Sequence, residues 1–140
     1  MSIHFFTEPP LDFELKKGEA LSQWFQSVAH SEKQEIESLN YIFCTDDYLL
    51  EMNRAHLQHD YYTDVITFDN RENENEPISG DIFISYDRVL ENAQTFSANP
   101  TNELHRVMVH GLLHLLGYMD KSESDQKIMR EKEDEYLEQQ

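Results

Sequence analysis

The chain has 140 residues, of which 39% are hydrophobic and 11% aromatic, enough for one ordinary domain with a buried core. Its 28 acidic and 11 basic residues give a formal net charge of −17, which argues against tight nonspecific binding to naked duplex nucleic acid. The single cysteine, Cys44, excludes an internal disulfide, and no apolar run approaches the ~18 residues that suggest a membrane span. We therefore expect a cytoplasmic protein without a membrane segment.

Runs of β-branched and aromatic residues indicate strands, and apolar residues three or four positions apart indicate helices. Residues 69–79 are polar and acidic and contain Pro77, which predicts an exposed loop. Asn99 followed by Pro100 is typical of a helix start. These signals predict one α+β domain over residues 1–140, with a sheet of about four strands. In chain order we expect a strand at 2–7, a helix at 17–30, a strand at 37–44, a helix at 46–58, strands at 63–68 and 80–85, a helix at 87–96, a central helix from Pro100 and a charged helix at 124–137.

The central helix carries the strongest chemical signal. Residues 104–120 are apolar on nearly every face, which is typical of a helix that is buried all round, yet they include His110 and His114. A spacing of four puts the two imidazoles about 40° apart on one face, so that both can reach one ion. In a continuous helix Asp120 would lie about 9 Å beyond His114, but Gly117 lets the helix end and the chain reverse. We therefore predict a metal site made of His110, His114 and Asp120.

Three segments resemble, in order, motifs of the YbeY family, which are bacterial zinc-dependent endoribonucleases and rRNA maturation factors. They are residues 63–68 (TDVITF), 80–84 (GDIFI) and 110–118 (HGLLHLLGY), and the resemblance covers roughly residues 49–137. It implies a compact α+β fold with a mixed sheet packed with helices, and one zinc ion per chain, with another divalent metal left open. It also implies a cytoplasmic single-strand-specific endoribonuclease in rRNA maturation and ribosome quality control, whose partner is rRNA, a ribosomal subunit or a ribosomal protein.

Three protein ligands leave a fourth position for water, which is typical of catalytic rather than closed structural zinc sites. The hypothesis for RNA cleavage is that metal-activated water, or the metal itself, acts on a phosphodiester. Most family members supply a histidine where this chain has Asp120, and the extra negative charge makes the ion a weaker Lewis acid. The resemblance further implies an arginine and a lysine at the positions of Leu57 and His59.

Other basic residues near the predicted site can replace the family arginine in binding RNA or stabilising charge. Arg54, Arg106 and His59 are candidates, and Asp64 in the first family motif is a further candidate for the cleft. Glu103 lies one heptad before His110 and so on its face, which allows a role as a base. We interpret it instead as a first-turn glutamate stabilised by the helix dipole.

A zinc peptidase is one alternative, because such enzymes share the spacing of the metal ligands. Their general base is a glutamate directly after the first histidine, and this chain has Gly111 there, which has no proton-accepting group. A peptide-cleavage assay with zinc present shows whether the protein is a peptidase or a nuclease.

A non-catalytic ribosome-associated factor with a structural metal is the second alternative. The acidic balance, Asp120 and the missing arginine favour it. Replacing His114 by alanine separates the two cases, because loss of a structural metal unfolds the domain and loss of a catalytic metal does not.

Overall fold

The computed structural model describes residues 2–57 and 62–140. Within these residues four strands and five helices follow one another in the order that the sequence predicts, with small differences at their ends. The elements are β1 (Ser2–Thr7), α1 (Gly18–Ser31), β2 (Ile36–Cys44), α2 (Asp46–Leu57), β3 (Val65–Asp69), β4 (Ile78–Ser85), α3 (Tyr86–Thr95), α4 (Pro100–Leu116) and α5 (Glu123–Glu138).

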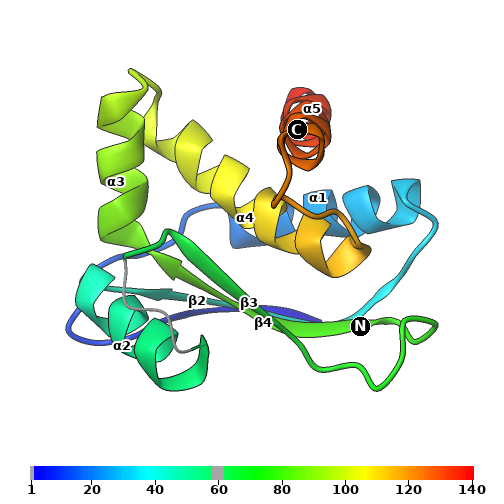
Figure 1. Ribbon diagram of the computed structural model, residues 1–140, viewed down its shortest axis with the longest axis horizontal. Coiled ribbons are helices and arrows are strands. Elements are labelled where there is room, and N and C mark those ends of the chain that lie inside the picture. The colour runs from blue at the N-terminus through cyan, green and yellow to red at the C-terminus, as the bar shows by residue number, and fades with distance from the viewer. Residues whose placement is uncertain (1, 58–61) are drawn as a thin grey trace.

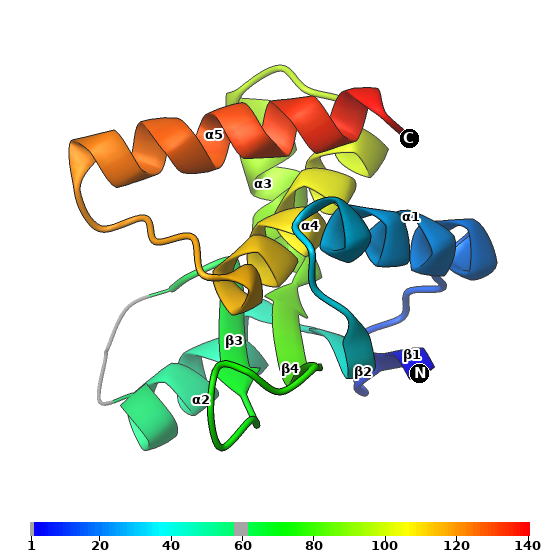
Figure 2. The ribbon, with the colours of Figure 1, turned by 90° about the vertical axis from the view of Figure 1, so that its right-hand side faces the viewer.

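The four strands form one mixed sheet in the order β1-β2-β4-β3. β1, β2 and β4 run parallel to one another, and β3 pairs antiparallel with β4 at the edge. The helices α1, α3 and α4 cover one face of this sheet and α2 lies against the other, while α5 packs on the far side of α4 as an outer layer (Figures 1 and 2). The α+β fold with a mixed four-stranded sheet is therefore confirmed.

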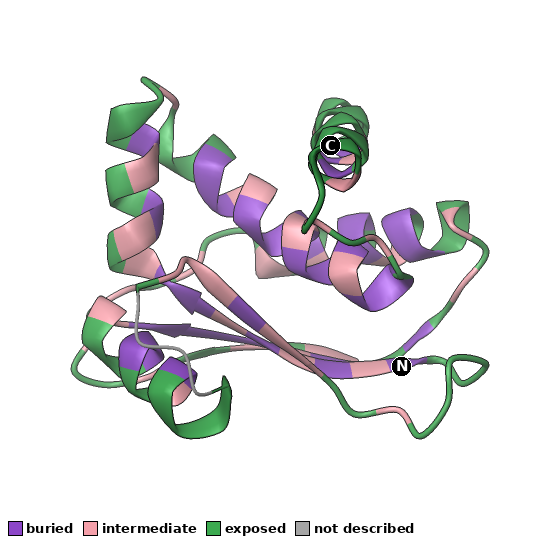
Figure 3. Ribbon diagram, in the orientation of Figure 1, coloured by how far each residue is buried: buried purple, intermediate pink, exposed green. Residues whose placement is uncertain are grey.

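The alternation of side chains along β4 explains why both faces of the sheet are covered. Ile82 and Ile84 join the main core beneath α4, whereas Phe83 points the other way and packs with Leu49 of α2 and Ile66 of β3. Figure 3 shows burial concentrated along α4 and the central strands, with the outward face of α5 exposed. The predicted central helix is thus the most enclosed helix of the described chain.

The acidic loop after β3 is shorter than predicted, because β4 begins at Ile78. The amide of Ile78 donates to the carbonyl of Glu35 and the residue pairs with Ile36 of β2, so the strand starts directly after Pro77. Proline has no N–H to donate and is well placed at this boundary. β3 in turn begins at Val65, two residues later than predicted.

Both ends of α4 follow the sequence signals. The side chain of Asn99 caps the first turn by accepting from the amides of Thr101 and Asn102. Gly117 ends the helix with φ of 114°, in the left-handed region, and the next amide, that of Tyr118, donates to the carbonyl of Leu113. This reversal directs the chain back toward the helix it has just left.

No helix among residues 2–57 and 62–140 is long and apolar enough to cross a membrane.

Candidate metal centre

The reversal at Gly117 brings Asp120 to the two histidines of α4, as predicted. The Nε2 atoms of His110 and His114 lie 3.0 Å apart. Oδ2 of Asp120 lies 3.4 Å from Nε2 of His110 and 3.3 Å from Nε2 of His114. The three side chains are partly exposed, so the triad faces solvent at the edge of the core. Among the described residues this is the group of histidine and carboxylate side chains that can hold a metal ion.

The spacing of these three atoms suits a tetrahedral ion. Bonds of ~2.0–2.1 Å to nitrogen and oxygen at tetrahedral angles separate neighbouring ligand atoms by about 3.3 Å. The three observed separations, 3.0, 3.3 and 3.4 Å, agree with that value. The donor set of two imidazoles and one carboxylate also matches catalytic zinc sites, which keep a fourth position open. The residues present therefore fit a zinc ion.

A buried glutamate from α5 fixes the ring of His110. Oε2 of Glu133 lies 2.6 Å from Nδ1 of His110, and the Glu133 side chain is only 6% exposed. Arg106 on α4 holds the other carboxylate oxygen of Glu133 at 2.9 Å and pairs with Asp134 at 2.7 Å. Such carboxylate contacts set the tautomer of a ligating histidine and leave Nε2 free for the ion.

The ring of His114 is fixed by a neutral acceptor instead. Its Nδ1 lies 3.0 Å from the backbone carbonyl oxygen of Tyr118 in the turn after α4. The Tyr118 hydroxyl donates to Glu32 at 2.8 Å, and the same carboxylate accepts from Tyr136 and pairs with Lys132 at 3.5 Å. Glu32 at the end of α1 therefore ties the turn that carries Asp120 to α5.

The two imidazoles differ in basicity although they lie one turn apart. Burial lowers the pKa of His110, but the hydrogen bond and charge of Glu133 outweigh it, so that this pKa lies above its usual value. Burial and the neighbouring His110 lower the pKa of His114. The carboxylate of Glu133 thus makes His110 the more basic of the two rings.

The other predicted cleft residues lie in different settings. Asp64 precedes β3, accepts from the side-chain amide of Asn92 at 3.2 Å, and is close enough for its charge to interact with that of His110. Burial raises the pKa of Asp64, and the charge of His110 partly offsets this. Arg106 lies beside the site, bound to the two acids of α5. Leu57 is the last residue of α2 and is 40% exposed, and His59 lies outside the described residues.

Sequence reasoning missed Glu133, although a signal was present. Glu133 lies four residues after Met129 and three before Tyr136, both of which are buried. It therefore falls on the apolar stripe of α5, where a charged residue needs a partner. The pattern indicates that Glu133 faces inward but not which residue it meets, because His110 is 23 positions earlier.

Gly111 is pressed against the sheet and leaves no room for the general base of a peptidase. A Cβ atom at this position would lie 2.8 Å from Cγ2 of Ile82 and 3.4 Å from Cγ2 of Thr67. A glutamate here would point into the packed interface between α4 and the sheet rather than toward the ligands. The peptidase reading is therefore not favoured.

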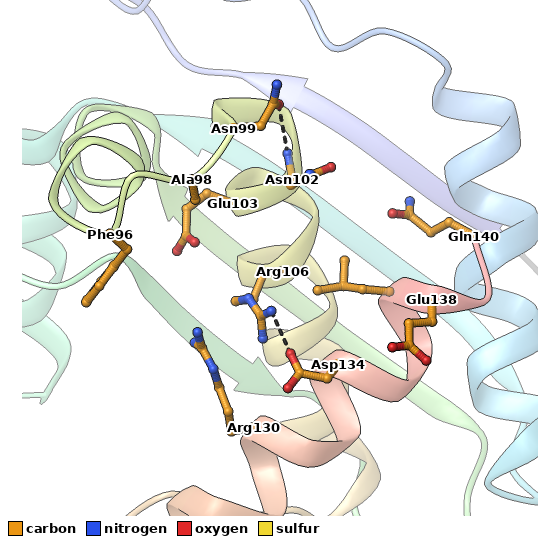
Figure 4. Close-up of a pocket in the computed structure, with 11 residues that line it drawn as sticks. Phe96, Ala98, Asn99, Asn102, Glu103, Arg106, Arg130, Asp134, Glu138 and Gln140 are labelled. Carbon is orange, nitrogen blue, oxygen red and sulfur yellow. Dashed lines mark hydrogen bonds and ion pairs between the residues drawn. The ribbon is translucent and has the colours of Figure 1, made fainter.

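One hollow adjoins the triad, and a second lies between α4 and α5. A cleft of about 820 Å³ is lined by His114, Gly117 and Met119 on one side and by the loop at 74–77 on the other. A second hollow of about 500 Å³ lies between the start of α4 and α5, where Arg106 and Asp134 meet (Figure 4). The triad therefore adjoins the larger hollow through His114.

The fold and the triad place the chain among α+β proteins that can hold a metal ion between a buried helix and the turn that ends it. A family model described as Endoribonuclease YbeY matches residues 11–140, beginning well before the motifs that carried the resemblance. The chain belongs to the YbeY family.

Individual relatives agree with this assignment over nearly their whole length. Endoribonuclease YbeY of Cytophaga hutchinsonii is 51% identical over 133 residues, which are 95% of this chain and 92% of the relative. Endoribonuclease YbeY of Parabacteroides distasonis is 45% identical over 139 residues, covering 98% of this chain and 94% of the relative. The solution structure of TM1509 from Thermotoga maritima is similar with a TM-score of 0.67 at 30% identity, covering 98% of this chain and 87% of that one.

Proposed function

We propose that the protein is a zinc-dependent endoribonuclease that cuts single-stranded RNA in rRNA maturation and ribosome quality control, acting in the cytoplasm as one domain over residues 1–140. Membership of the family supports the activity, which is that of a hydrolase. The convergence of His110, His114 and Asp120 at the spacing of a tetrahedral ion supports the metal dependence.

The residues that bind the metal and the residues that orient them have separate roles in this proposal. His110 and His114 hold the ion through Nε2 and Asp120 holds it through a carboxylate oxygen. When bound, zinc supplies a Lewis acid and lowers the pKa of a coordinated water. Glu133 and the carbonyl of Tyr118 each hold an Nδ1 atom, which keeps the Nε2 lone pairs directed at one point.

Asp64 is the residue that we assign to accept a proton during cleavage. Its carboxylate is held by Asn92 beside the site, and burial raises its pKa. A carboxylate in that environment binds a proton more readily than an exposed aspartate does. Replacing Asp64 by asparagine should lower the rate of cleavage by about 10²–10⁴-fold while zinc still binds, and loss of zinc in this variant would contradict the assignment.

The charge of the chain supports an RNA substrate presented by a ribosomal partner. A net charge of −17 repels free RNA, and Arg106 beside the site is already paired with Glu133 and Asp134. A basic ribosomal protein, or a ribosomal subunit that holds the RNA strand in place, offsets that repulsion. Cleavage of rRNA within subunits should therefore exceed cleavage of the same rRNA free in solution.

Removal of the metal tests the proposal directly. Stripping the purified protein with a chelator should abolish cleavage of single-stranded RNA, and added zinc should restore it. Elemental analysis should find one zinc per chain, and none in a His110→Ala variant. A protein that cuts equally well after the metal has been stripped would contradict the proposal.

A ligand variant separates a catalytic metal from a structural one. His114→Ala should lose cleavage but keep its fold by circular dichroism, and His30→Ala, an exposed histidine at the end of α1, should keep both. If His114→Ala unfolds, the metal is structural. A casein assay with zinc present should show no peptidase activity, because Gly111 provides no base.

A further inference from the structure

The hollow between α4 and α5 contains a feature that the metal centre does not use. It lies where the turn after α3, the first turns of α4 and the second half of α5 meet, and it has a volume of about 500 Å³. Phe96, Glu103 and Arg130 line it. Figure 4 shows the carboxylate of Glu103 and the guanidinium of Arg130 directed toward the space beside Phe96.

Glu103 is nearly buried as a residue, and its carboxylate faces the hollow. Its exposed fraction is 9%, and its side chain makes no hydrogen bond or ion pair with any residue of the described ranges. Arg106, three residues later, is already occupied by Glu133 and Asp134. Burial raises the pKa of Glu103, and the nearby charge of Arg106 only partly offsets this. No buried side-chain oxygen of the described residues lacks a partner, so the unpaired oxygens of Glu103 open into the hollow, where they can accept from a ligand that brings its own donors.

Phe96 supplies a flat apolar surface at the mouth of the same hollow. It follows α3 and is 68% exposed, the most exposed of the large apolar side chains in the described chain. Arg130 stands opposite with a side chain that is 62% exposed, and its nearest acid is Glu133 at 3.9 Å. An exposed aromatic ring beside hydrogen-bonding groups is how proteins hold an unstacked base of single-stranded RNA.

The hollow is also in line with the metal centre. Glu103 lies seven residues before His110, which places both on one face of α4 and about 10 Å apart along its axis. A short stretch of unstacked RNA covers that distance. A strand with one phosphodiester at the histidines can therefore place a neighbouring base in the hollow.

We propose that this hollow is a base-binding pocket that selects guanine in the RNA strand. Phe96 stacks on the base, and the two carboxylate oxygens of Glu103 accept from N1–H and the N2 amino group. Guanine alone among the four bases presents two adjacent donors on its Watson–Crick edge, which matches a carboxylate that only accepts. Arg130 lies where it can contact the adjacent phosphate. The role as an RNA subsite rests on the proposed nuclease function, whereas the recognition of guanine does not.

Binding of nucleoside monophosphates to the zinc-loaded full chain tests the pocket without a bond to cut. In NMR titrations followed at residues around Phe96, GMP should bind about tenfold more tightly than AMP, CMP or UMP. IMP, which lacks the N2 amino group, should fall between GMP and AMP. Because every probe carries the same phosphate, differences among them report the base.

Matched variants assign the preference to single side chains. Glu103→Gln should bring the affinity for GMP to that for AMP, whereas Glu138→Gln, which removes the same charge at the rim of the pocket, should leave the preference intact. Phe96→Ala should weaken all four nucleotides to a similar degree, because stacking is common to all bases. Equal binding of GMP and AMP by the unaltered protein, or a guanine preference that survives Glu103→Gln, would overturn the proposal. The first comparison needs no variant, so a folding defect in one cannot obscure the result.

Cleavage assays separate this inference from the proposed function. Single-stranded RNAs that differ only in one guanosine or inosine should be cut at different rates near that position. A protein that cuts all of them equally, with and without Glu103, remains a nuclease but has no guanine pocket. A protein that prefers GMP but cuts no RNA with zinc bound retains the pocket and contradicts the nuclease.

Discussion

The carboxylate of Glu133 lies 2.6 Å from Nδ1 of His110, although the two residues come from different helices. This contact is enclosed, with Glu133 only 6% exposed, and Arg106 completes it by binding the second carboxylate oxygen. The pair therefore couples the packing of α5 on α4 to the orientation of one proposed metal ligand.

Replacing Glu133 by glutamine should weaken zinc binding by about 10–100-fold, because the amide orients the ring less strongly and carries no charge. Competition with a chromophoric zinc chelator measures this change. Asp134→Asn is the matched control, since Asp134 also pairs with Arg106 but does not contact His110. Zinc affinity equal in Glu133→Gln and the unaltered protein, or lowered as much by Asp134→Asn, would show that Glu133 does not position the ligand.

Replacing Gly111 by alanine should lower the free energy of unfolding by about 1–3 kcal/mol, because the added methyl group would meet Ile82 at 2.8 Å across a packed interface. Urea denaturation of the metal-free protein measures this effect. Gly18→Ala is the control, since its Cβ would meet only the ring of Phe5 at an ordinary 3.5 Å. If both variants are equally stable, α4 is not packed against the sheet as closely as the structure shows.

Glu32 should make the stability of the protein depend on pH in the acid range. Burial raises the pKa of Glu32, but hydrogen bonds from Tyr136 and Tyr118 outweigh it and hold this pKa below its usual value of 4.5. The stabilisation is therefore complete above pH 4.5 and is lost as the pH falls through the lower folded-state pKa.

Glu32→Gln should accordingly cost about 1–3 kcal/mol of unfolding free energy at neutral pH, and the difference from the unaltered protein should shrink in strong acid. Denaturation curves at several pH values measure it. Glu37→Gln, at an exposed position of β2, should change stability by less than about 0.5 kcal/mol. A difference that grows on acidification would contradict a lowered pKa for Glu32.

Cys44 should resist alkylation while the protein is folded. Its side chain is buried, and burial together with the charges of Glu8, Asp87 and Asp46 raises its pKa to about 12. Because the thiolate is the reactive form, iodoacetamide should label the folded protein far more slowly than the protein in urea. Mass spectrometry of timed samples gives both rates, and rapid labelling under native conditions would contradict the buried position.

The convergence of the three candidate ligands could be predicted from the sequence because the information for it is local. His110, Gly117 and Asp120 lie within eleven residues, so helix geometry and the turn residue suffice to bring the ligands together. The signals at Asn99 and Pro100 likewise placed the start of α4 correctly.

The supports of the site could not be predicted in the same way. Glu133 and Glu32 lie 23 and 86 positions from the residues they bind, His110 and Tyr118, and pairings over such separations depend on the completed packing. Glu103 shows the opposite case. Its place on the face of His110 follows from spacing alone, but the hollow that its carboxylate faces forms only once α5 and the turn after α3 are in position.

The residues that hold the candidate ligands in place are synthesised after the ligands themselves. His110, His114 and Asp120 leave the ribosome before α5, which supplies Glu133 and the Tyr136 partner of Glu32. A nascent chain that ends just after Asp120 has all three proposed ligands, but it lacks the carboxylate of Glu133 that orients the ring of His110. If the proposed metal site is correct, tight metal binding should develop only after α5 has been made and has docked, so an unfinished copy should cleave RNA poorly.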